Sequence, residues 1–180
     1  MVKLVLEQLN RSRHERTGFD CGNDEVNNFL RKSANKLQIQ QASQTYVLVK
    51  EEQTAGLQPI VGFFTLTYSE IRREETPSDE EMKKFPRFPL PAIRLAWLGV
   101  DSQYQNTKDR IGAAVLLLAL GEAYRIVSNS GLGVAVIVDP LTKQSDSFFK
   151  KYGFQEMERD FGNLKSLYIR MTTVKDMLQI

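Results

Sequence analysis

The part of the chain best suited to chemistry is a polar loop that joins an apolar stretch to a long apolar helix. Residues 95–100 are mostly apolar, residues 101–109 are polar, and a helical pattern begins at Arg110. A helix N-terminus after such a loop offers several backbone N–H groups and the positive end of the helix dipole to one anion. Gly112 stands where a Cβ atom would keep a phosphate from the backbone. The spacing predicts a pyrophosphate-binding loop, although an ordinary crossover connection has the same pattern.

Side chains that could move a proton stand at two further places. Tyr68, Ser69 and Glu70 end an expected strand, and Tyr152 ends an expected helix just before Gly153. A phenol or carboxyl group can act as general acid or base when it reaches the reacting atoms. The alternatives are a solvated strand end for the first group and packing beside Gly153 for Tyr152.

Three other reactive side chains stand alone in the sequence. His14 is the only histidine, and its polar, arginine-flanked segment predicts a solvated surface position. Cys21 lies in a turn before a helix, where a thiol pKa can fall, but no base accompanies it, so a small buried side chain is expected. Asp139 ends a strand and either contacts substrate or caps the next turn. Without a His/Cys cluster, no metal site is predicted.

The basic residues allow two interpretations. Eight of them could converge on a phosphate-binding face, or they could lie scattered over the surface. They are Lys83, Lys84, Arg87, Arg94, Lys108, Lys150, Lys151 and Lys165.

Hydrophobic periodicity and turn residues predict the elements that position these side chains. Helices are expected from the N-cap Asn23 to about residue 37, at about 110–129 and at about 143–152. Within the excursion 71–91, Ser78 and Glu81 indicate a short capped helix. The order predicts a mixed α/β fold in a single domain, residues 1–180. Strands are expected at residues 2–9, 45–51, 60–68, 92–100, 133–138, 154–158 and 166–171.

The bulk properties suit such a domain. The chain has 180 residues, 42% of them hydrophobic, one cysteine and a formal net charge of +2, too small to indicate nucleic-acid binding by itself. The first nine residues carry Lys3 and Glu7 in place of a secretory signal, and the apolar run 111–120 is shorter than the ~20 residues that span a bilayer. We therefore expect a cytoplasmic protein without a membrane segment.

Motifs along nearly the whole chain resemble one protein family. FDCGN at 19–23 leads into NNFLRKSAN, and QASQTYVL, IVGFFTL, LGVDSQYQ and SFFKKYGF follow at 41–48, 60–66, 98–105 and 147–154. In this order they resemble GNAT acetyltransferases, most closely the toxins of type II toxin–antitoxin modules. The resemblance implies a GNAT fold, with a central mixed, splayed sheet of about six to seven strands and about four flanking helices.

The resemblance also implies a reaction. Acetyl-CoA would lie between the strands that end at Asp101 and Asp139, and a neutral primary amine would attack its thioester without a metal. In the toxin branch that amine belongs to aminoacyl-tRNA; a small molecule or a ribosomal protein is the alternative acceptor. Further expected partners are an antitoxin and a second copy in a homodimer. The residues carried over for cofactor binding are Leu98, Gly99, Val100, Gln105, Arg110, Ile111, Gly112, Ala113, Phe148 and Phe149.

One departure from the family pattern lies in the pyrophosphate loop. In the preferred register Gly112 is the second loop glycine and Arg110 replaces the first, where its guanidinium either contacts phosphate or obstructs the loop. In the other register Gly112 is the first glycine and Asp109 opens the motif.

A second departure concerns the general acid. The tyrosine that serves the toxins falls at Phe149, which has no proton to give, so Tyr152, Tyr68 and Glu70 are the candidates to replace it. Two hypotheses result: an active N-acetyltransferase, and a catalytically impaired GNAT-fold protein that binds a partner or a CoA ester.

Overall fold

The computed structural model describes residues 3–52 and 55–180, which form two compact units. Unit 1 comprises Met1–Thr67 and Ala96–Ala119, and unit 2 comprises Tyr68–Leu95 and Leu120–Ile180. Three elements contribute residues to both units: strands β4 (Gln58–Ile71) and β5 (Leu90–Val100) and helix α3 (Ile111–Ser130). The single domain over residues 1–180 stays a prediction.

The strands of unit 1 form an antiparallel ladder. β1 (Leu4–Gln8) pairs with β3 (Gln44–Lys50), and β3 pairs with β4. Apolar and aromatic side chains fill the buried positions of this ladder and pack across it. Tyr46, for example, stacks on Phe64 of the neighbouring strand with ring centroids 5.0 Å apart. A two-residue strand, β2 (His14–Glu15), adds a parallel pairing with the start of β4.

A continuous helical segment crosses unit 1 in three parts. It consists of α1 (Asp24–Asn28), a π-helical turn (Phe29–Ser33) and α2 (Ala34–Ile39). The side chain of Asn23 accepts hydrogen bonds from the backbone N–H groups of residues 25 and 26, which confirms the predicted N-cap. The buried face of this segment joins a cluster that includes Phe19, Leu30 and Phe63.

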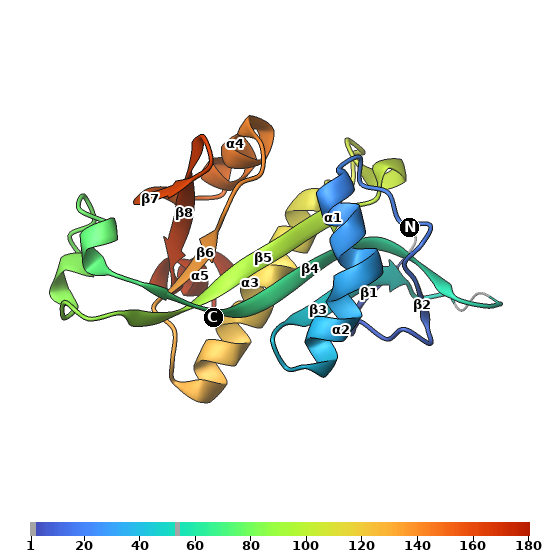
Figure 1. The fold of residues 1–180 in the computed structure, drawn as a ribbon, viewed down its shortest axis with the longest axis horizontal. Coiled ribbons are helices and arrows are strands. Elements are labelled where there is room, and N and C mark those ends of the chain that lie inside the picture. Colours follow the sequence, from blue (N-terminus) through green and yellow to red (C-terminus); the bar gives the residue numbers. More distant parts are fainter. Residues whose placement is uncertain (1–2, 53–54) are drawn as a thin grey trace. The chain divides into compact units, whose positions relative to one another are not determined.

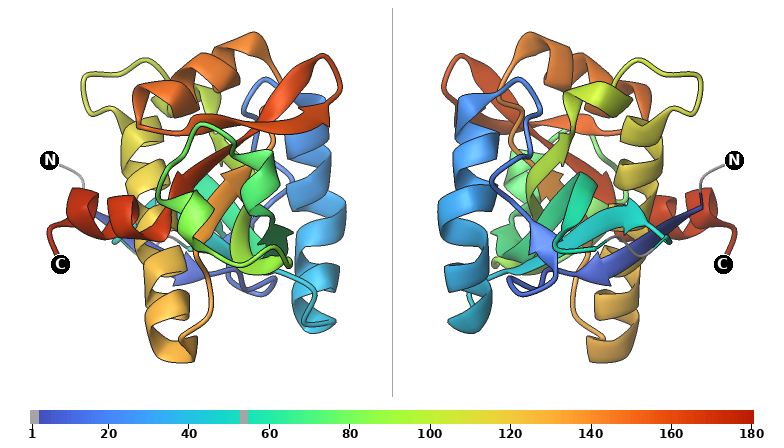
Figure 2. Two further views of the ribbon diagram at one scale, coloured as in Figure 1. Left: turned by 90° about the vertical axis from the view of Figure 1, so that its left-hand side faces the viewer. Right: turned by 90° about the vertical axis from the view of Figure 1, so that its right-hand side faces the viewer.

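Two close approaches show how unit 1 is layered. A Cβ atom at Gly99 would lie 2.9 Å from Val26 on α1, and one at Gly62 would lie 3.0 Å from Val115 on α3. The helical segment 24–39 and the first half of α3 therefore cover opposite faces of the strands, as Figures 1 and 2 show. Glycine is required at Gly99 because the helix packs directly on the backbone.

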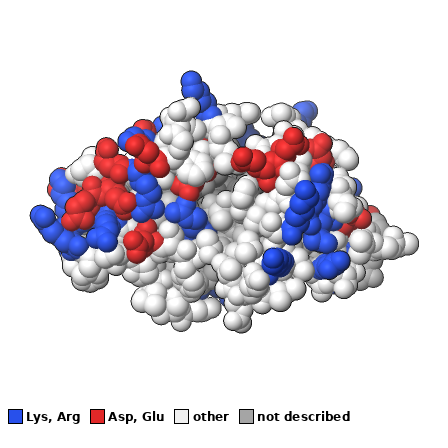
Figure 3. All heavy atoms as spheres, viewed as in Figure 1, with Lys and Arg blue, Asp and Glu red and all other residues white. Residues whose placement is uncertain are grey.

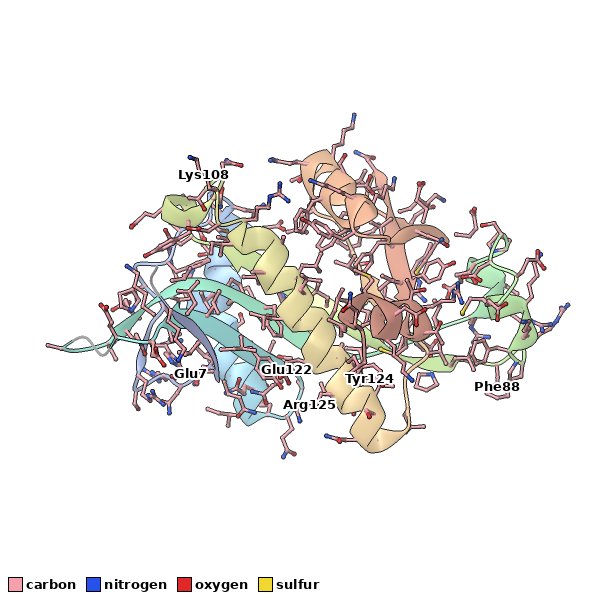
Figure 4. The ribbon with its side chains drawn as sticks, turned by 180° about the vertical axis from the view of Figure 1, so that it is seen from behind. Glu7, Phe88, Lys108, Glu122, Tyr124 and Arg125 are labelled. Atoms are coloured by element: carbon pink, nitrogen blue, oxygen red, sulfur yellow. The ribbon has the colours of Figure 1, made fainter. Side chains whose placement is uncertain are left out.

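His14 is buried, which corrects the expectation of a solvated side chain. Its side chain has no exposed surface; Nε2 lies 3.0 Å from a Glu7 carboxylate oxygen, and Nδ1 accepts a hydrogen bond from the backbone N–H of Asn10. Figure 4 labels Glu7 beside this loop. The polar neighbours misled the prediction because they serve as hydrogen-bond partners of the ring.

Unit 2 is built on a second part of the sheet. β5 pairs in parallel with β6 (Ala135–Val138), which pairs antiparallel with β8 (Leu164–Arg170), and β8 forms a hairpin with β7 (Gln155–Phe161). Helices α4 (Lys143–Lys151) and α5 (Met171–Leu178) complete the unit. The hydrogen-bonded strand order is β1-β3-β4-β5-β6-β8-β7, with β2 on β4. The mixed α/β fold is confirmed, and β2 and α5 are the elements that the sequence analysis missed.

The excursion between β4 and β5 is anchored by a buried carboxylate. It contains two 3₁₀ turns, η2 (Arg73–Glu75) and η3 (Met82–Lys84). Asp79 accepts hydrogen bonds from the N–H groups of residues 81 and 82 and from the hydroxyl of Tyr168 at 2.8 Å. The side chain that bonds the backbone at the start of η3 is therefore that of Asp79 and not that of the predicted Ser78. Burial and the adjacent Asp79 carboxylate raise the pKa of Tyr168.

Among the described residues, α3 is the one helix long and apolar enough to cross a membrane by length and composition. A core helix passes the same test, and Leu116, Ala119 and Leu120 of α3 are buried in the fold. On its outer side Arg125 pairs with Glu122 at 2.8 Å, and Figure 4 labels both beside Tyr124.

Candidate active site

The cofactor-binding residues predicted from 98 to 113 form one strand, loop and helix unit within unit 1. The ladder of β5 with β6 covers Ile93–Leu95, whereas β5 continues to Val100. On the edge of β5 that faces β6, the backbone groups of Leu98, Gly99 and Val100 therefore lie outside the ladder between the two strands. A ligand with amide groups, such as a pantetheine arm, can pair with an edge of this kind.

Gln105 has a different position from the one expected for a direct cofactor ligand. Its side-chain amide donates to the carbonyl oxygen of Val100 at 2.7 Å and to that of Cys21 at 2.8 Å. Asp101 complements it: the buried carboxylate accepts from the N–H groups of Asp20 and Gln103 at 3.1 and 3.0 Å. These bonds tie the end of β5 to the turn before α1, so Gln105 fixes the loop from within.

The first turn of α3 presents the free backbone N–H groups on which the predicted anion site depends. The N–H groups of Ile111, Gly112 and Ala113 have no carbonyl four residues earlier within the helix, whereas Ala114 N–H reaches the carbonyl of Arg110 at 3.2 Å. Arg110 has a φ of 49°, and Asn106 one of 54°. This left-handed conformation is the one that glycine adopts most readily. It suits the register in which Arg110 replaces a loop glycine.

The residues predicted on α4 pack together in unit 2. Phe149 is buried, and its ring meets those of Phe148 and Phe154 edge-on at 5.4 and 5.5 Å. Tyr152 caps the helix, half-buried, with its ring 5.2 Å from Phe148. Tyr152 therefore has the packing that the sequence favoured, and it keeps part of its surface exposed.

The candidates at the end of β4 are open to solvent. Tyr68 is 66% exposed, and Glu70 is also exposed, with its backbone carbonyl accepting from Arg159 at 3.0 Å. Among residues 3–52 and 55–180, neither side chain has a hydrogen-bond or ion-pair partner that would orient it for proton transfer, so their catalytic roles stay predictions.

A polar network that the sequence analysis did not assemble lies at the end of β6 in unit 2, beside the middle of β5. Arg94 forms an ion pair with Asp139, and its other terminal nitrogen donates to the Ser69 hydroxyl at 3.2 Å. Asp139 also accepts from Ser166 at 2.5 Å. Asp139 is thus held by side chains and does not cap the next turn. The signal for this network was an acidic residue and a basic residue on neighbouring strands.

Cys21 has no feature of a nucleophile. It is half-buried, its thiol donates weakly to the carbonyl of Asn23, and burial raises the pKa of the thiol. Within residues 3–52 and 55–180, no group of three or more His, Cys, Asp and Glu side chains is placed to hold a metal ion.

Most of the eight predicted phosphate-binding cations are engaged in ion pairs. Lys83 and Lys84 pair with Glu80 and Glu81 at 2.6 and 2.9 Å, and Lys150 pairs with Asp146 at 2.9 Å. Arg87, Arg94 and Lys165 pair with Glu74, Asp139 and Asp160. Lys108 stands apart in the loop before α3 (Figure 4). Each paired cation would have to give up its carboxylate partner to bind a phosphate, so these ion pairs weaken the case for a phosphate-binding face built from these eight residues.

Comparison with known proteins agrees with this arrangement. No family model matches the chain. It is 26% identical over 163 residues to a probable toxin TacT of Sinorhizobium fredii, covering 87% of this chain and 86% of that one. It is 24% identical over 139 residues to a tRNA-acetylating toxin of Mycobacterium tuberculosis, covering 77% of each.

Solved structures match over nearly the full chain. A tyrosine-to-phenylalanine variant of KacT superposes with a TM-score of 0.84 at 23% identity, covering 97% of this chain and 98% of that one. AtaT complexed with acetyl-methionyl-tRNAfMet gives 0.83 at 21% identity, covering 98% and 99%. The chain therefore has the fold of these GNAT-type toxins. In sequence it is similar to toxin acetyltransferases of toxin–antitoxin systems.

Proposed function

We propose that this protein is an acetyl-CoA-dependent N-acetyltransferase that acetylates the amine of aminoacyl-tRNA in the cytoplasm, as the toxin of a toxin–antitoxin module. The observation that carries the proposal is the sequence match to a tRNA-acetylating toxin over 77% of both chains. Further support comes from the fold shared with AtaT, which has been solved bound to acetyl-CoA in complex with AtaR. An antitoxin and a homodimer are proposed partners on the same grounds.

Unit 1 supplies the groups that fit acetyl-CoA. The edge of β5 at Leu98–Val100 would pair with the pantetheine amides, and the N–H groups that begin α3 would hold the pyrophosphate. Because the Val100 carbonyl already accepts from Gln105, we expect the pantetheine to use the remaining backbone groups of this edge. The guanidinium of Arg110 stands beside the same turn and can add a charge-assisted bond to phosphate.

The chemistry requires that the neutral amine attack the thioester carbonyl and that the departing thiolate receive a proton. The amine loses one proton and the thiolate gains one, so the transfer is balanced without a metal or redox partner. Backbone N–H groups can stabilise the oxyanion. Tyr152 is our preferred donor of the proton, because it is the tyrosine nearest in sequence to the position where Phe149 replaces a tyrosine.

A second candidate function is supported by Phe149 itself. Without the usual hydroxyl, the protein could bind acetyl-CoA or a partner without transferring the acetyl group. A missing general acid lowers a rate by about 10²–10⁴-fold, so slow transfer and no transfer must be told apart by measurement.

Two assays test the proposal. Addition of acetyl-CoA is expected to raise the melting temperature, and incubation with radiolabelled acetyl-CoA and bulk aminoacyl-tRNA is expected to label the tRNA in an alkali-sensitive form. A melting shift without labelled tRNA would support the binding protein instead. No shift and no labelling would reject acetyl-CoA for either role.

A further inference from the structure

The helical segment of unit 1 begins a stretch without acidic residues. From Val26 to Lys50 the chain has no Asp or Glu, while the residues just before it, Asp24 and Glu25, are acidic. The stretch is rich in uncharged amides. Its cations are Arg31, Lys32, Lys36 and Lys50.

Two of these cations, Lys32 and Lys36, are presented by the structure without local neutralisation. Lys32 lies on the π-helical turn and Lys36 four residues later on α2, so both face one side, and both are exposed. Within residues 3–52 and 55–180, no carboxylate lies within ion-pair distance of either lysine. Arg31 lies beside them, half-buried, and donates to the carbonyl of Phe19. Figure 3 shows a blue strip along this segment, with the acidic first turn at one end.

Three lysines of unit 2 differ from Lys32 and Lys36 in this respect. Lys83, Lys84 and Lys150 each lie within 3 Å of a carboxylate oxygen. A lysine that is already paired must give up its partner to bind a phosphate, whereas an unpaired exposed lysine exchanges only mobile counterions. Two unpaired lysines are therefore expected to contribute more to the affinity for a polyanion than two lysines that are already paired with carboxylates.

We propose that the outer face of this segment, carrying Lys32 and Lys36, binds the phosphate backbone of the tRNA acceptor. The inference rests on the proposed function, which supplies a polyanionic substrate. Lys32 and Lys36 are separated by about 6 Å along the helix axis, so they reach different phosphates of one strand. Uncharged amides between the cations, such as Asn35, can donate to phosphate oxygens without adding repulsion.

The test measures binding and not acetyl transfer. Unfractionated deacylated tRNA with a fluorescent label is titrated with wild-type protein and with the double variant Lys32→Ala/Lys36→Ala at several salt concentrations. The expected result is a roughly tenfold loss of affinity at low salt and a salt slope smaller by about 2. Lys32→Arg/Lys36→Arg is expected to restore both.

The matched control is Lys83→Ala/Lys84→Ala, which removes the same charge from two lysines that pair with Glu80 and Glu81. Its tRNA affinity and salt slope are expected to stay at the wild-type values. Equal weakening in both variants would show an effect of net charge alone and would overturn the proposal. Wild-type affinity in Lys32→Ala/Lys36→Ala would overturn it as well.

Acetyl transfer separates this inference from the proposed function. If both hold, Lys32→Ala/Lys36→Ala raises the KM for aminoacyl-tRNA and leaves kcat and the KM for acetyl-CoA unchanged. If the protein binds tRNA through these lysines but transfers no acetyl group, the tRNA-binding surface is supported and the proposed acetyltransferase function is rejected. If the protein is active and neither double lysine-to-alanine variant changes its kinetics, the tRNA-binding surface is rejected and the acetyltransferase function stands.

Discussion

Phe149 occupies the position that the family resemblance gives to a proton-donating tyrosine, and its ring is buried against Phe148 and Phe154. Phe149→Tyr is expected to raise kcat for acetyl transfer roughly tenfold or more, because it returns a general acid. The KM for acetyl-CoA should not change, since the ring keeps its place. Steady-state kinetics with aminoacyl-tRNA checks this.

Phe148→Tyr adds the same hydroxyl on the adjacent ring and is the control for this experiment. Tyr152→Phe should abolish the residual activity of the wild-type protein if Tyr152 is the proton donor. Unchanged turnover in Phe149→Tyr would mean that protonation of the thiolate does not depend on this position.

Gln105 also acts at the scale of one residue. Gln105→Glu replaces a donor to two carbonyl oxygens with a carboxylate that repels them, so the loop before α3 should lose its anchor. We expect the KM for acetyl-CoA to rise about tenfold, from the loss of bonds worth about 1 kcal/mol each. Gln103→Glu places the same charge in the same loop and should have a much smaller effect; a similar rise would point to charge repulsion alone.

At the scale of the element, unit 1 depends on how closely α1 approaches β5. Gly99→Val would force a side chain into space held by Val26, Phe63 and Phe19, whose nearest atoms lie 2.9, 3.0 and 3.3 Å from the added Cβ. Overpacking of this kind costs about 1–3 kcal/mol in the free energy of unfolding. Urea denaturation monitored by circular dichroism measures it.

Gly121→Ala is the matched substitution for Gly99→Val. A Cβ at Gly121 in α3 meets no atom within 4 Å, and alanine is favoured over glycine within a helix by about 1 kcal/mol. It should leave stability unchanged or raise it. Equal stability of Gly99→Val and wild type would show that α1 is not packed on this strand.

At the scale of the whole molecule, buried polar contacts join segments that are distant in the sequence. In unit 2, Asp79 of the excursion meets Tyr168 of β8 at 2.8 Å and Arg170 at 3.2 Å. Arg159 of β7 adds contacts of 2.8 Å to Glu75. These contacts hold the excursion against the hairpin.

The variant Tyr168→Phe tests this arrangement through the pH dependence of the free energy of unfolding. Because the folded-state pKa of Tyr168 lies above its unfolded value of about 10, folding favours the neutral phenol, and the stability it contributes is present below pH 10. That stability is lost as the pH rises above 10, where only the unfolded state ionises. The variant should unfold about 1 kcal/mol more easily at pH 7 and show a shallower loss above pH 10.

Urea denaturation from pH 7 to pH 11 measures this difference. The control is Tyr68→Phe, which alters a 66% exposed side chain and should follow the wild-type pH curve. Parallel curves for Tyr168→Phe and wild type would contradict the role assigned to the buried phenol.

The sequence by itself determined the order and type of nearly all strands and long helices, because period-2 and period-3.6 patterns are local. Asn23 could be recognised as an N-cap for the same reason. The helix α5 was missed because Met171–Leu178 follows β8 without a turn signal. The strand β2 was missed because two residues are too few to show a pattern.

Only the tertiary structure decided which polar groups meet. The burial of His14 depends on Glu7, the anchoring role of Gln105 on Cys21, and the neutralisation of Arg94 on Asp139. Each of these partners lies on another segment. Hydrogen bonds and ion pairs act over a few ångströms in space, and no periodicity along the chain encodes them.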